Sequence, residues 1–233
     1  MGDKFNTFFE QFITKGGYKT ALEGLLATAE IAVGGLIIGI LLGTLIAIVR
    51  VMPKYKRLPK ILDGVCNVYV AIFRGTPMVV QLLVGYYVLL PILGIQVANG
   101  IGVAIIIFGL NSAAYISEMM RSGIQSVDIG QLEAARALGL PYGTSMLKIV
   151  IPQSIKNILP TLGNEFIVLV KDTSIVSFIA VTDLYKAFKA IGDSTYEFVV
   201  PYLFLAIVYL VIVLGITLLV RLMERRLQKS ERK

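Results

Sequence analysis

Histidine is absent from this sequence of 233 residues, and cysteine occurs once, at Cys66. A single cysteine cannot form a disulfide within the chain, and without histidine it cannot complete a zinc site. The sequence also lacks a Gly-x-x-x-x-Gly-Lys-Ser/Thr phosphate-binding loop, and no nucleophile lies in a pattern with a general base. We therefore expect no catalytic residue, no metal site and no bound cofactor, and any ATP chemistry must belong to another chain.

Charged residues are also scarce, at 16%, whereas 56% of the residues are hydrophobic and the mean hydropathy is +0.79. A soluble domain of this length cannot bury that much apolar surface in one core, so a lipid bilayer must solvate much of it. The net charge of +7 could indicate nucleic acid binding. Basic residues that flank membrane spans explain this charge better, and we expect no nucleic acid partner.

Five long apolar stretches predict an all-α protein with five transmembrane helices in one domain, residues 1–233. The helices are expected at about 18–50, 64–92, 98–122, 153–176 and 196–222. Residues 75–117 carry no formal charge but are too long for one span, and a turn signal near their middle divides them into two helices. The fourth stretch is the weakest because several charged residues interrupt it.

The distribution of lysine and arginine predicts the orientation of these helices. Basic residues follow the first, third and fifth helices, and the loop between the second and third helices contains none. They are Arg50, Lys54, Lys56, Arg57 and Lys60 after the first, Arg121, Arg136 and Lys148 after the third, and Arg221, Arg225, Arg226, Lys229, Arg232 and Lys233 after the fifth. The N-terminus is therefore expected outside the cell and the C-terminus inside. Five spans are consistent with this pattern, whereas four or six are not.

Three glycines in the first apolar stretch, Gly35, Gly39 and Gly43, are spaced four residues apart and so share one face of a helix. A ridge of small residues lets another helix approach closely. Two interpretations stay open, namely packing within the subunit, which we favour, and contact with a second subunit.

The segment between the third and fourth helices, residues 129–152, is long for a loop and has helical character over 131–138. Glycine and proline then interrupt that helix before a second helical piece at 146–151. A short helix–turn–helix of this kind is typical of a surface that docks against another protein.

This segment resembles the signature of the permease subunits of binding-protein-dependent ABC importers, which reads Glu-Ala-Ala, three residues, Gly, nine residues, Ile, one residue and Leu-Pro. The matching residues are Glu133, Ala134, Ala135, Gly139, Ile149, Ile151 and Pro152, with isoleucine in place of leucine as the one departure. Flanking motifs resemble the polar amino acid branch of that family. They are 73–77 with Gln81, 111–115 with Glu118 and Arg121, 130–133, and 171–174.

The resemblance implies the transmembrane subunit of an ATP-driven importer that carries amino acids across the cytoplasmic (inner) membrane of a prokaryote. It implies that Gly130, Glu133, Ala134, Ala135 and Gly139 belong to a coupling helix, which sits in a cleft of an ABC ATPase subunit that binds ATP and magnesium. It also implies an extracellular solute-binding protein and a second permease. We favour a homodimer, and the sequence leaves a heterodimer open.

Polar side chains at membrane depth predict the path of the substrate. On the third helix, Asn111, Tyr115 and Glu118 follow one another at spacings of four and three residues and so lie on one face. On the fourth helix, Asn164 and Glu165 lie at a depth similar to that of Asn111. Because adjacent residues of a helix point about 100° apart, at most one of these two points straight into a cavity.

Structural roles for the same residues stay open. Glu118 could be neutralised by Arg121, three residues further along the helix, and Asn111 and Asn164 could fasten neighbouring helices. If Glu118 and Glu165 both line the path, a basic amino acid is the favoured substrate, and the exact amino acid stays undetermined. The alternative function is a secondary transporter or channel subunit driven by an ion gradient, although such chains usually contain paired repeats that this sequence lacks.

Overall fold

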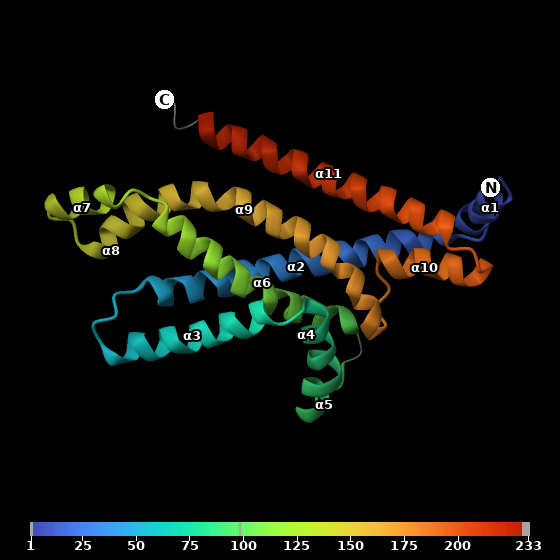
Figure 1. Cartoon of the computed structure of the whole chain (residues 1–233), viewed down its shortest axis with the longest axis horizontal. Coiled ribbons are helices and arrows are strands. Elements are labelled where there is room, and N and C mark those ends of the chain that lie inside the picture. Colours follow the sequence, from blue (N-terminus) through green and yellow to red (C-terminus); the bar gives the residue numbers. More distant parts are fainter. Residues whose placement is uncertain (1, 98, 230–233) are drawn as a thin grey trace.

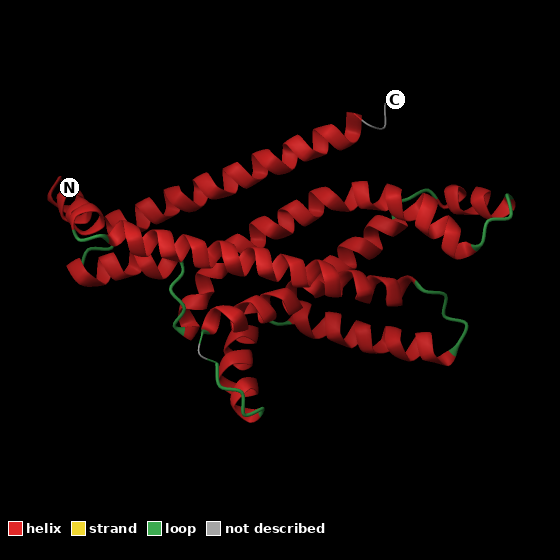
Figure 2. Cartoon of the chain, turned by 180° about the vertical axis from the view of Figure 1, so that it is seen from behind, coloured by secondary structure: helices red, strands yellow, loops and turns green. Residues whose placement is uncertain are grey.

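The computed structural model describes residues 2–97 and 99–229, and every regular element within these ranges is helical (Figure 1, Figure 2). The elements are α1 (Gly2–Phe9), the π-helical η1 (Glu10–Thr14), α2 (Gly17–Val51), α3 (Arg57–Gly75), α4 (Met78–Val84), the π-helical η2 (Gly85–Leu89), α5 (Leu90–Ile92), α6 (Gly100–Gln125), α7 (Ile129–Ala137), α8 (Tyr142–Ser145), the π-helical η3 (Met146–Val150), α9 (Ile151–Asp172), the 3₁₀-helical η4 (Thr173–Ile179), α10 (Leu184–Thr195) and α11 (Val199–Lys229). Ala98, the expected first residue of the third helix, and the basic residues Arg232 and Lys233 lie outside the described residues.

The centre of the fold is the pairing of α2 with α6, the most extensive contact between two helices in the described chain. Gly35, Gly39 and Gly43 are all buried on the side of α2 that faces α6. At Gly39 the approach is so close that an added Cβ atom would lie 2.8 Å from the Cβ and Oγ atoms of Ser112. The glycine ridge therefore packs within the subunit, as the favoured interpretation predicted.

The segment expected as one helix over 64–92 is instead two helical pieces that meet at an angle of 107°. The break falls at Thr76 and Pro77, between the end of α3 and the start of α4. Proline lacks the backbone N–H that a helix needs, and it disfavours helical geometry in the residue before it. Thr76 is accordingly extended, with φ −121° and ψ 144°.

A glutamine side chain satisfies the backbone at this corner. Nε2 of Gln81 donates hydrogen bonds to the carbonyl oxygens of Phe73 at 2.8 Å and of Thr76 at 3.0 Å. Oε1 of Gln81 accepts a hydrogen bond of 2.9 Å from Nδ2 of Asn111 on α6. Broken helices at membrane depth need such partners, because hydrocarbon offers none. The corner between α3 and α4 is thus fastened to α6.

Three helices of the described chain, α2, α6 and α11, are long and apolar enough to cross a bilayer, and the bent α3–α5 segment is a fourth if it counts as one span. The fourth helix of the sequence prediction, 153–176, corresponds to α9 and begins two residues earlier, at Ile151. Its 22 residues extend about 33 Å at a rise of about 1.5 Å per residue.

The two ends of the molecule differ in structure. One end carries the hairpin of α7 and α8 together with the C-terminal end of α11, and the other carries α1 and α10 (Figure 1, Figure 2). Asp183 caps α10, because its carboxylate accepts hydrogen bonds of 3.0 Å from the backbone N–H groups of Tyr185 and Lys186. Burial raises the pKa of this carboxyl group, and the two N–H donors act against that rise.

Candidate functional site

Three of the polar residues predicted from the sequence meet in one cavity of about 390 Å³ between α4, α6 and α9. We call it the Glu165 cavity. Its lining residues are Thr76, Pro77, Met78, Phe108, Asn111, Tyr115, Glu165, Val168, Leu169 and Asp172. The periodicity of α6 brings Asn111 and Tyr115 to the same side, one turn apart. The cavity offers amide, hydroxyl and carboxylate groups, which are the partners that a zwitterionic solute requires.

Glu165 is held in place by a residue of the closely packed α2–α6 pair. Its side chain is buried, and its Oε1 atom accepts a hydrogen bond of 2.8 Å from Oγ of Ser112. Ser112 in turn packs against Gly39 of α2, so the glycine ridge positions this carboxylate indirectly. Asn164, its neighbour in sequence, is exposed on another side of α9. Of the two adjacent residues, Glu165 is thus the one that enters the cavity.

Two polar lining residues were missed by the sequence reasoning. Asp172 was expected near the end of the fourth helix but was not named as a residue of the path, and Thr76 was read as part of a continuous helix. The structure places Asp172 at the end of α9, seven residues after Glu165 and therefore on the same face. That seven-residue spacing of two carboxylates is a signal that the sequence contained. Thr76 reaches the cavity because the chain bends at Pro77, and the sequence reasoning did not predict that bend.

Glu118 lies in a different cavity, which we call the Arg74 cavity. It has a volume of about 630 Å³ and is lined by Arg74, Glu118, Met119, Arg121, Ser122, Gly123, Ser126, Asn157 and Thr161. The predicted face of α6 is therefore shared between two cavities, with Asn111 and Tyr115 in the first and Glu118 in the second.

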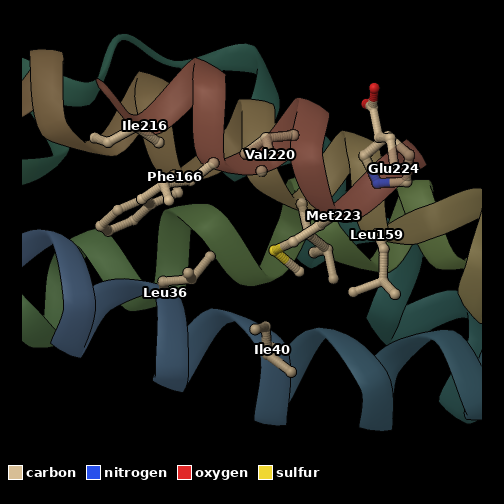
Figure 3. Close-up of a pocket in the computed structure, with 12 residues that line it drawn as sticks. Leu36, Ile40, Leu159, Phe166, Ile216, Val220, Met223 and Glu224 are labelled. Atoms are coloured by element: carbon tan, nitrogen blue, oxygen red, sulfur yellow. The ribbon is translucent and has the colours of Figure 1, made fainter. Parts of the chain in front are cut away.

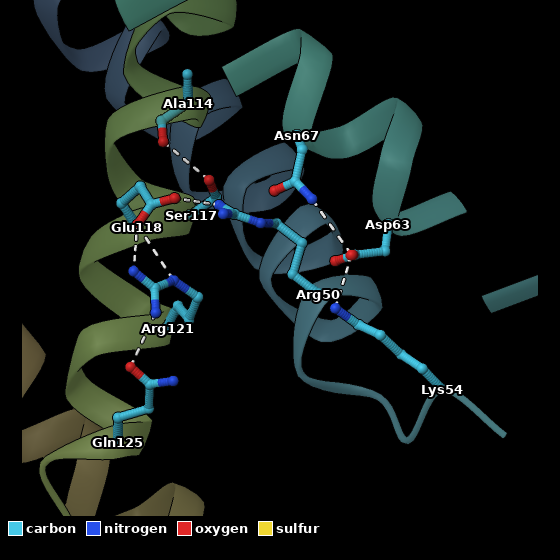
Figure 4. A network of polar contacts seen from close by, with 9 residues as sticks. All are labelled: Arg50, Lys54, Asp63, Asn67, Ala114, Ser117, Glu118, Arg121 and Gln125. Atoms are coloured by element: carbon cyan, nitrogen blue, oxygen red, sulfur yellow. Dashed lines mark hydrogen bonds and ion pairs between the residues drawn. The ribbon is translucent and has the colours of Figure 1, made fainter. Parts of the chain in front are cut away.

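The Glu118 carboxylate is engaged by two arginines (Figure 4). Its Oε1 atom pairs with Arg50 of α2, and its Oε2 atom accepts a hydrogen bond of 2.8 Å from NH2 of Arg121. Arg121 also donates to Oε1 of Gln125 at 2.9 Å. Nearby, Lys54 and Asp63 join α3 to the segment that follows α2, with 2.6 Å between Nζ and Oδ2. The arrangement includes the Glu118–Arg121 pairing that was considered as a structural role.

A further cavity of about 320 Å³, between α2, α9 and α11, is apolar (Figure 3). Side chains such as Leu36, Ile40, Phe166 and Met223 line it, and the carboxylate of Glu224 points away from them. Apolar walls cannot replace the water that a zwitterion loses on burial. This cavity is therefore unsuited to a zwitterionic solute, in contrast to the two polar cavities.

The hairpin of α7 and α8 has the form that the sequence indicated. Asp128 caps α7 by accepting a hydrogen bond of 2.7 Å from the backbone N–H of Gly130. At the other end Gly139 has φ +85°, a left-handed conformation that glycine adopts without strain. The N–H of Leu140 donates to the carbonyl of Ala135 at 3.2 Å and closes the helix end.

Beyond this turn, α8, η3 and α9 follow one another without a break, so the hairpin is continuous with the helix that lines both polar cavities. Gly130, Glu133, Ala134 and Gly139 are exposed, and Ala135 is buried against the rest of the fold. A force applied to the hairpin would therefore reach α9 through helical backbone.

Comparison with known proteins places this architecture in a family. Residues 35–229 match the family described as "Binding-protein-dependent transport system inner membrane component". The chain is 38% identical to the arginine transport system permease protein ArtQ of Bacillus subtilis, over 90% of this chain and 93% of that one. It is 37% identical to the putative glutamine transport system permease protein GlnP of Rickettsia prowazekii, over 88% and 92% of the two chains.

Solved structures agree with these sequence relatives. The crystal structure of an amino acid ABC transporter with histidines has a TM-score of 0.83 at 38% identity and covers 92% of this chain and 98% of that chain. An inward-facing structure of the MetNI methionine ABC transporter has a TM-score of 0.75 at 17% identity, which supports the fold alone. The matched span and the extent of the identity establish that this chain belongs to the inner membrane components of binding-protein-dependent transport systems.

Proposed function

We propose that this chain is the membrane-spanning subunit of an ATP-driven amino acid importer in the cytoplasmic membrane of a prokaryote. The observation that carries the proposal is the Glu165 cavity, a polar cavity among apolar helices whose α9 wall continues into the α7–α8 hairpin. The permease relatives named above support it, since their names assign them to arginine and glutamine transport. ATP hydrolysis resides on a separate subunit, because the sequence has no phosphate-binding loop.

The proposed topology has five spans, with the N-terminus outside and the C-terminus inside. In this arrangement α2, the bent α3–α5 segment, α6, α9 and α11 are the spans. The length of α9 supports its inclusion, since about 33 Å suffices for a hydrocarbon core of about 30 Å. The hairpin and the C-terminal end of α11 share one end of the molecule, which fits a common cytoplasmic side (Figure 1).

The partners follow from this assignment. We propose that Gly130, Glu133, Ala134, Ala135 and Gly139 form the coupling surface for an ABC ATPase with bound ATP and magnesium. The opposite end, with α1 and α10, would receive an extracellular solute-binding protein. None of the lining residues of the two polar cavities comes from α2, and both cavities are partly open, so a second copy of the chain would complete their walls.

The charge of the Glu165 cavity favours a basic amino acid. Two carboxylates, Glu165 and Asp172, line it together with the Asn111 amide. An opposite charge within a few ångströms stabilises a buried cation, which no neutral lining group does as well. A basic substrate also fits the name of the arginine permease relative.

The proposal is tested by transport into liposomes that contain this chain, its ATPase and its solute-binding protein. We expect labelled arginine to accumulate when ATP and magnesium are present on the ATPase side, and to stop accumulating when ATP is replaced by ADP. Ionophores that dissipate proton and sodium gradients should leave the rate unchanged. Accumulation without ATP, or its loss with ionophores, would support the ion-gradient alternative and contradict the proposal.

Two matched substitutions separate the roles of the carboxylates in the two cavities. Glu165→Gln should weaken arginine binding about tenfold or more relative to glutamine, because a hydrogen bond to a charged group contributes about 1.5–3 kcal/mol. Glu118→Gln should weaken binding of both amino acids equally, since arginines of the chain already engage that carboxylate. Thermal stabilisation of the purified permease–ATPase complex by each amino acid measures both effects. If Glu165→Gln weakens the binding of arginine and of glutamine equally, Glu165 does not recognise the charge of the substrate.

A further inference from the structure

The two polar cavities lie in series along the same helices. The Glu165 cavity uses residues 108–115 of α6 and 165–172 of α9, whereas the Arg74 cavity uses 118–126 of α6 and 157–161 of α9. The seven residues between Asn111 and Glu118 correspond to about 10 Å along α6 at a rise of about 1.5 Å per residue. A solute that moves along α6 and α9 from the first cavity toward the hairpin end therefore reaches the second.

One pair of side chains stands between the cavities. Tyr115 lines the Glu165 cavity, and Arg74 lines the Arg74 cavity. The guanidinium carbon of Arg74 lies 5.4 Å from the centre of the Tyr115 ring, within the range of a cation–π contact. Such a contact is modest in energy and therefore reversible, as a gate requires. The contact between the two side chains thus lies at the boundary between the two cavities.

The side chain of Arg74 is suited to movement. Arg74 is next to last in α3, and Gly75 and Thr76 connect it to the bend at Pro77. A Cβ atom added to Gly75 would meet nothing within 4 Å, so the chain has free space at this point. Gln81 holds the carbonyl oxygens of Phe73 and Thr76, on either side of Arg74, and is itself bonded to Asn111 of α6. The exposed Arg74 side chain can thus swing away from Tyr115 while the corner and the Glu165 cavity keep their shape.

The cavities carry opposite charge. Among the described residues that line it, the Glu165 cavity has the carboxylates Glu165 and Asp172 and no basic group. The Arg74 cavity has Arg74 and Arg121, and Arg50 also contacts its one carboxylate, Glu118. Among the described residues, two guanidinium groups thus line this cavity, and a third pairs with its carboxylate. A cation is attracted by the first cavity and repelled by the second.

We propose that Arg74, stacked on Tyr115, is the inner gate of the path and a filter that keeps cationic amino acids in the cytosol from returning to the Glu165 cavity. The inference rests on the proposed function, with the hairpin end facing the cytosol. When the gate opens, a cationic substrate passes once through the basic cavity and is released. With the gate closed, its guanidinium charge opposes entry from the cytosolic side.

The gate can be tested without measuring transport. Val168 lines the Glu165 cavity, so Val168→Cys in a Cys66→Ser background places one reporter thiol there. Inside-out vesicles that contain the assembled complex are treated with membrane-impermeant thiol reagents of similar size, one cationic and one anionic. We expect Arg74→Gln to raise the labelling rate for both reagents. The rise should be about tenfold larger for the cationic reagent, because the substitution removes a positive charge that this reagent must pass.

Arg74→Lys is the matched control, because it keeps the charge and loses the planar group that covers the tyrosine ring. It should raise both rates by the same factor. No change with Arg74→Gln, or an equal rise for both reagents, overturns the proposal. Labelling does not depend on uptake, so the two proposals are tested separately. A failure of ATP-driven arginine transport would contradict the proposed function, whereas the labelling rates alone test the gate.

Discussion

Replacement of Gly39 by valine is expected to reduce the amount of folded subunit in the membrane several-fold. Gly39 is buried, and a Cβ atom there would lie 2.8 Å from the Ser112 side chain and 3.1 Å from Cδ1 of Ile116. Both neighbours sit on α6, so relief of the clash must move that helix away from α2. Overpacking of this kind costs about 1–3 kcal/mol, and a loss of about 1–2 kcal/mol already changes abundance several-fold.

The damage should extend from the packing to the site. Ser112 donates the hydrogen bond that holds the Glu165 carboxylate, so displacement of Ser112 leaves a buried carboxylate without its partner. We expect the melting temperature of the detergent-purified complex to fall, and the remaining folded protein to lose arginine-dependent stabilisation. Both quantities come from the same thermal denaturation experiment.

Gly102→Val is the matched control for this prediction. Gly102 lies on α6, but it is exposed and a Cβ atom there would meet nothing within 4 Å. Its substitution should leave abundance and melting temperature close to those of the unsubstituted chain. If Gly39→Val accumulates normally and melts at the same temperature, the close approach of α2 and α6 is not what holds the subunit together.

The glycine ridge shows what local sequence can predict. A spacing of four residues identifies one face of a helix without reference to any other part of the chain. The same reasoning placed Asn111 and Tyr115 together on α6, and counting residues from the ends of the helices matched their depth to Glu165. Properties that repeat along one helix, or that depend on distance along it, are therefore accessible from sequence.

The bend between α3 and α4 was missed for a physical reason. Residues 75–92 continue the apolar composition of α3 without a charge, so hydropathy records no boundary there. The signal was Pro77, but proline also occurs within transmembrane helices when neighbouring groups satisfy the freed backbone. Here Gln81 satisfies the backbone of a sharp corner. Hydrogen bonding around the proline, which sequence does not reveal, distinguishes the two cases.

Contacts between distant segments were also beyond the sequence. Arg50 lies 68 residues before Glu118, and their pairing depends on how α2 crosses α6. Arg121, three residues after Glu118, was recognised as a partner because the spacing alone brings the two together. Arg74 and Tyr115 also lie on different helices, which explains why their contact was not predicted. A charge at membrane depth can be recognised from sequence, but its partner on another helix cannot.

Substitution of Gly139 by valine is expected to separate ATP hydrolysis from transport. Gly139 ends α7 with φ +85°, and a β-branched residue is strained in that conformation. A Cβ atom at this position would meet nothing within 4 Å, so the strain is in the backbone and the packing of the fold is spared. The substitution should therefore change the direction of α7 within the hairpin, while the transmembrane helices keep their structure.

The expected loss of coupled uptake follows from the coupling role that we propose for the hairpin. A coupling free energy of about 1–3 kcal/mol corresponds to a change of about 5- to 150-fold, and arginine uptake per ATP hydrolysed should fall within that range. The melting temperature and the arginine affinity of the complex should stay close to those of the unsubstituted protein, because both polar cavities lie away from Gly139. Uptake and hydrolysis are measured together in the same liposomes.

Two controls identify the cause. Gly139→Asn should preserve much of the coupling, because asparagine tolerates the left-handed conformation better than valine. Gly143→Val alters the same hairpin at a glycine without positive φ and with nothing within 4 Å of an added Cβ, so it should leave coupling intact. If Gly139→Val transports normally, the hairpin does not transmit the motion of the ATPase. If Gly143→Val is equally damaging, bulk at the docking surface is responsible, and the left-handed turn has no special role in the transfer of force to α9.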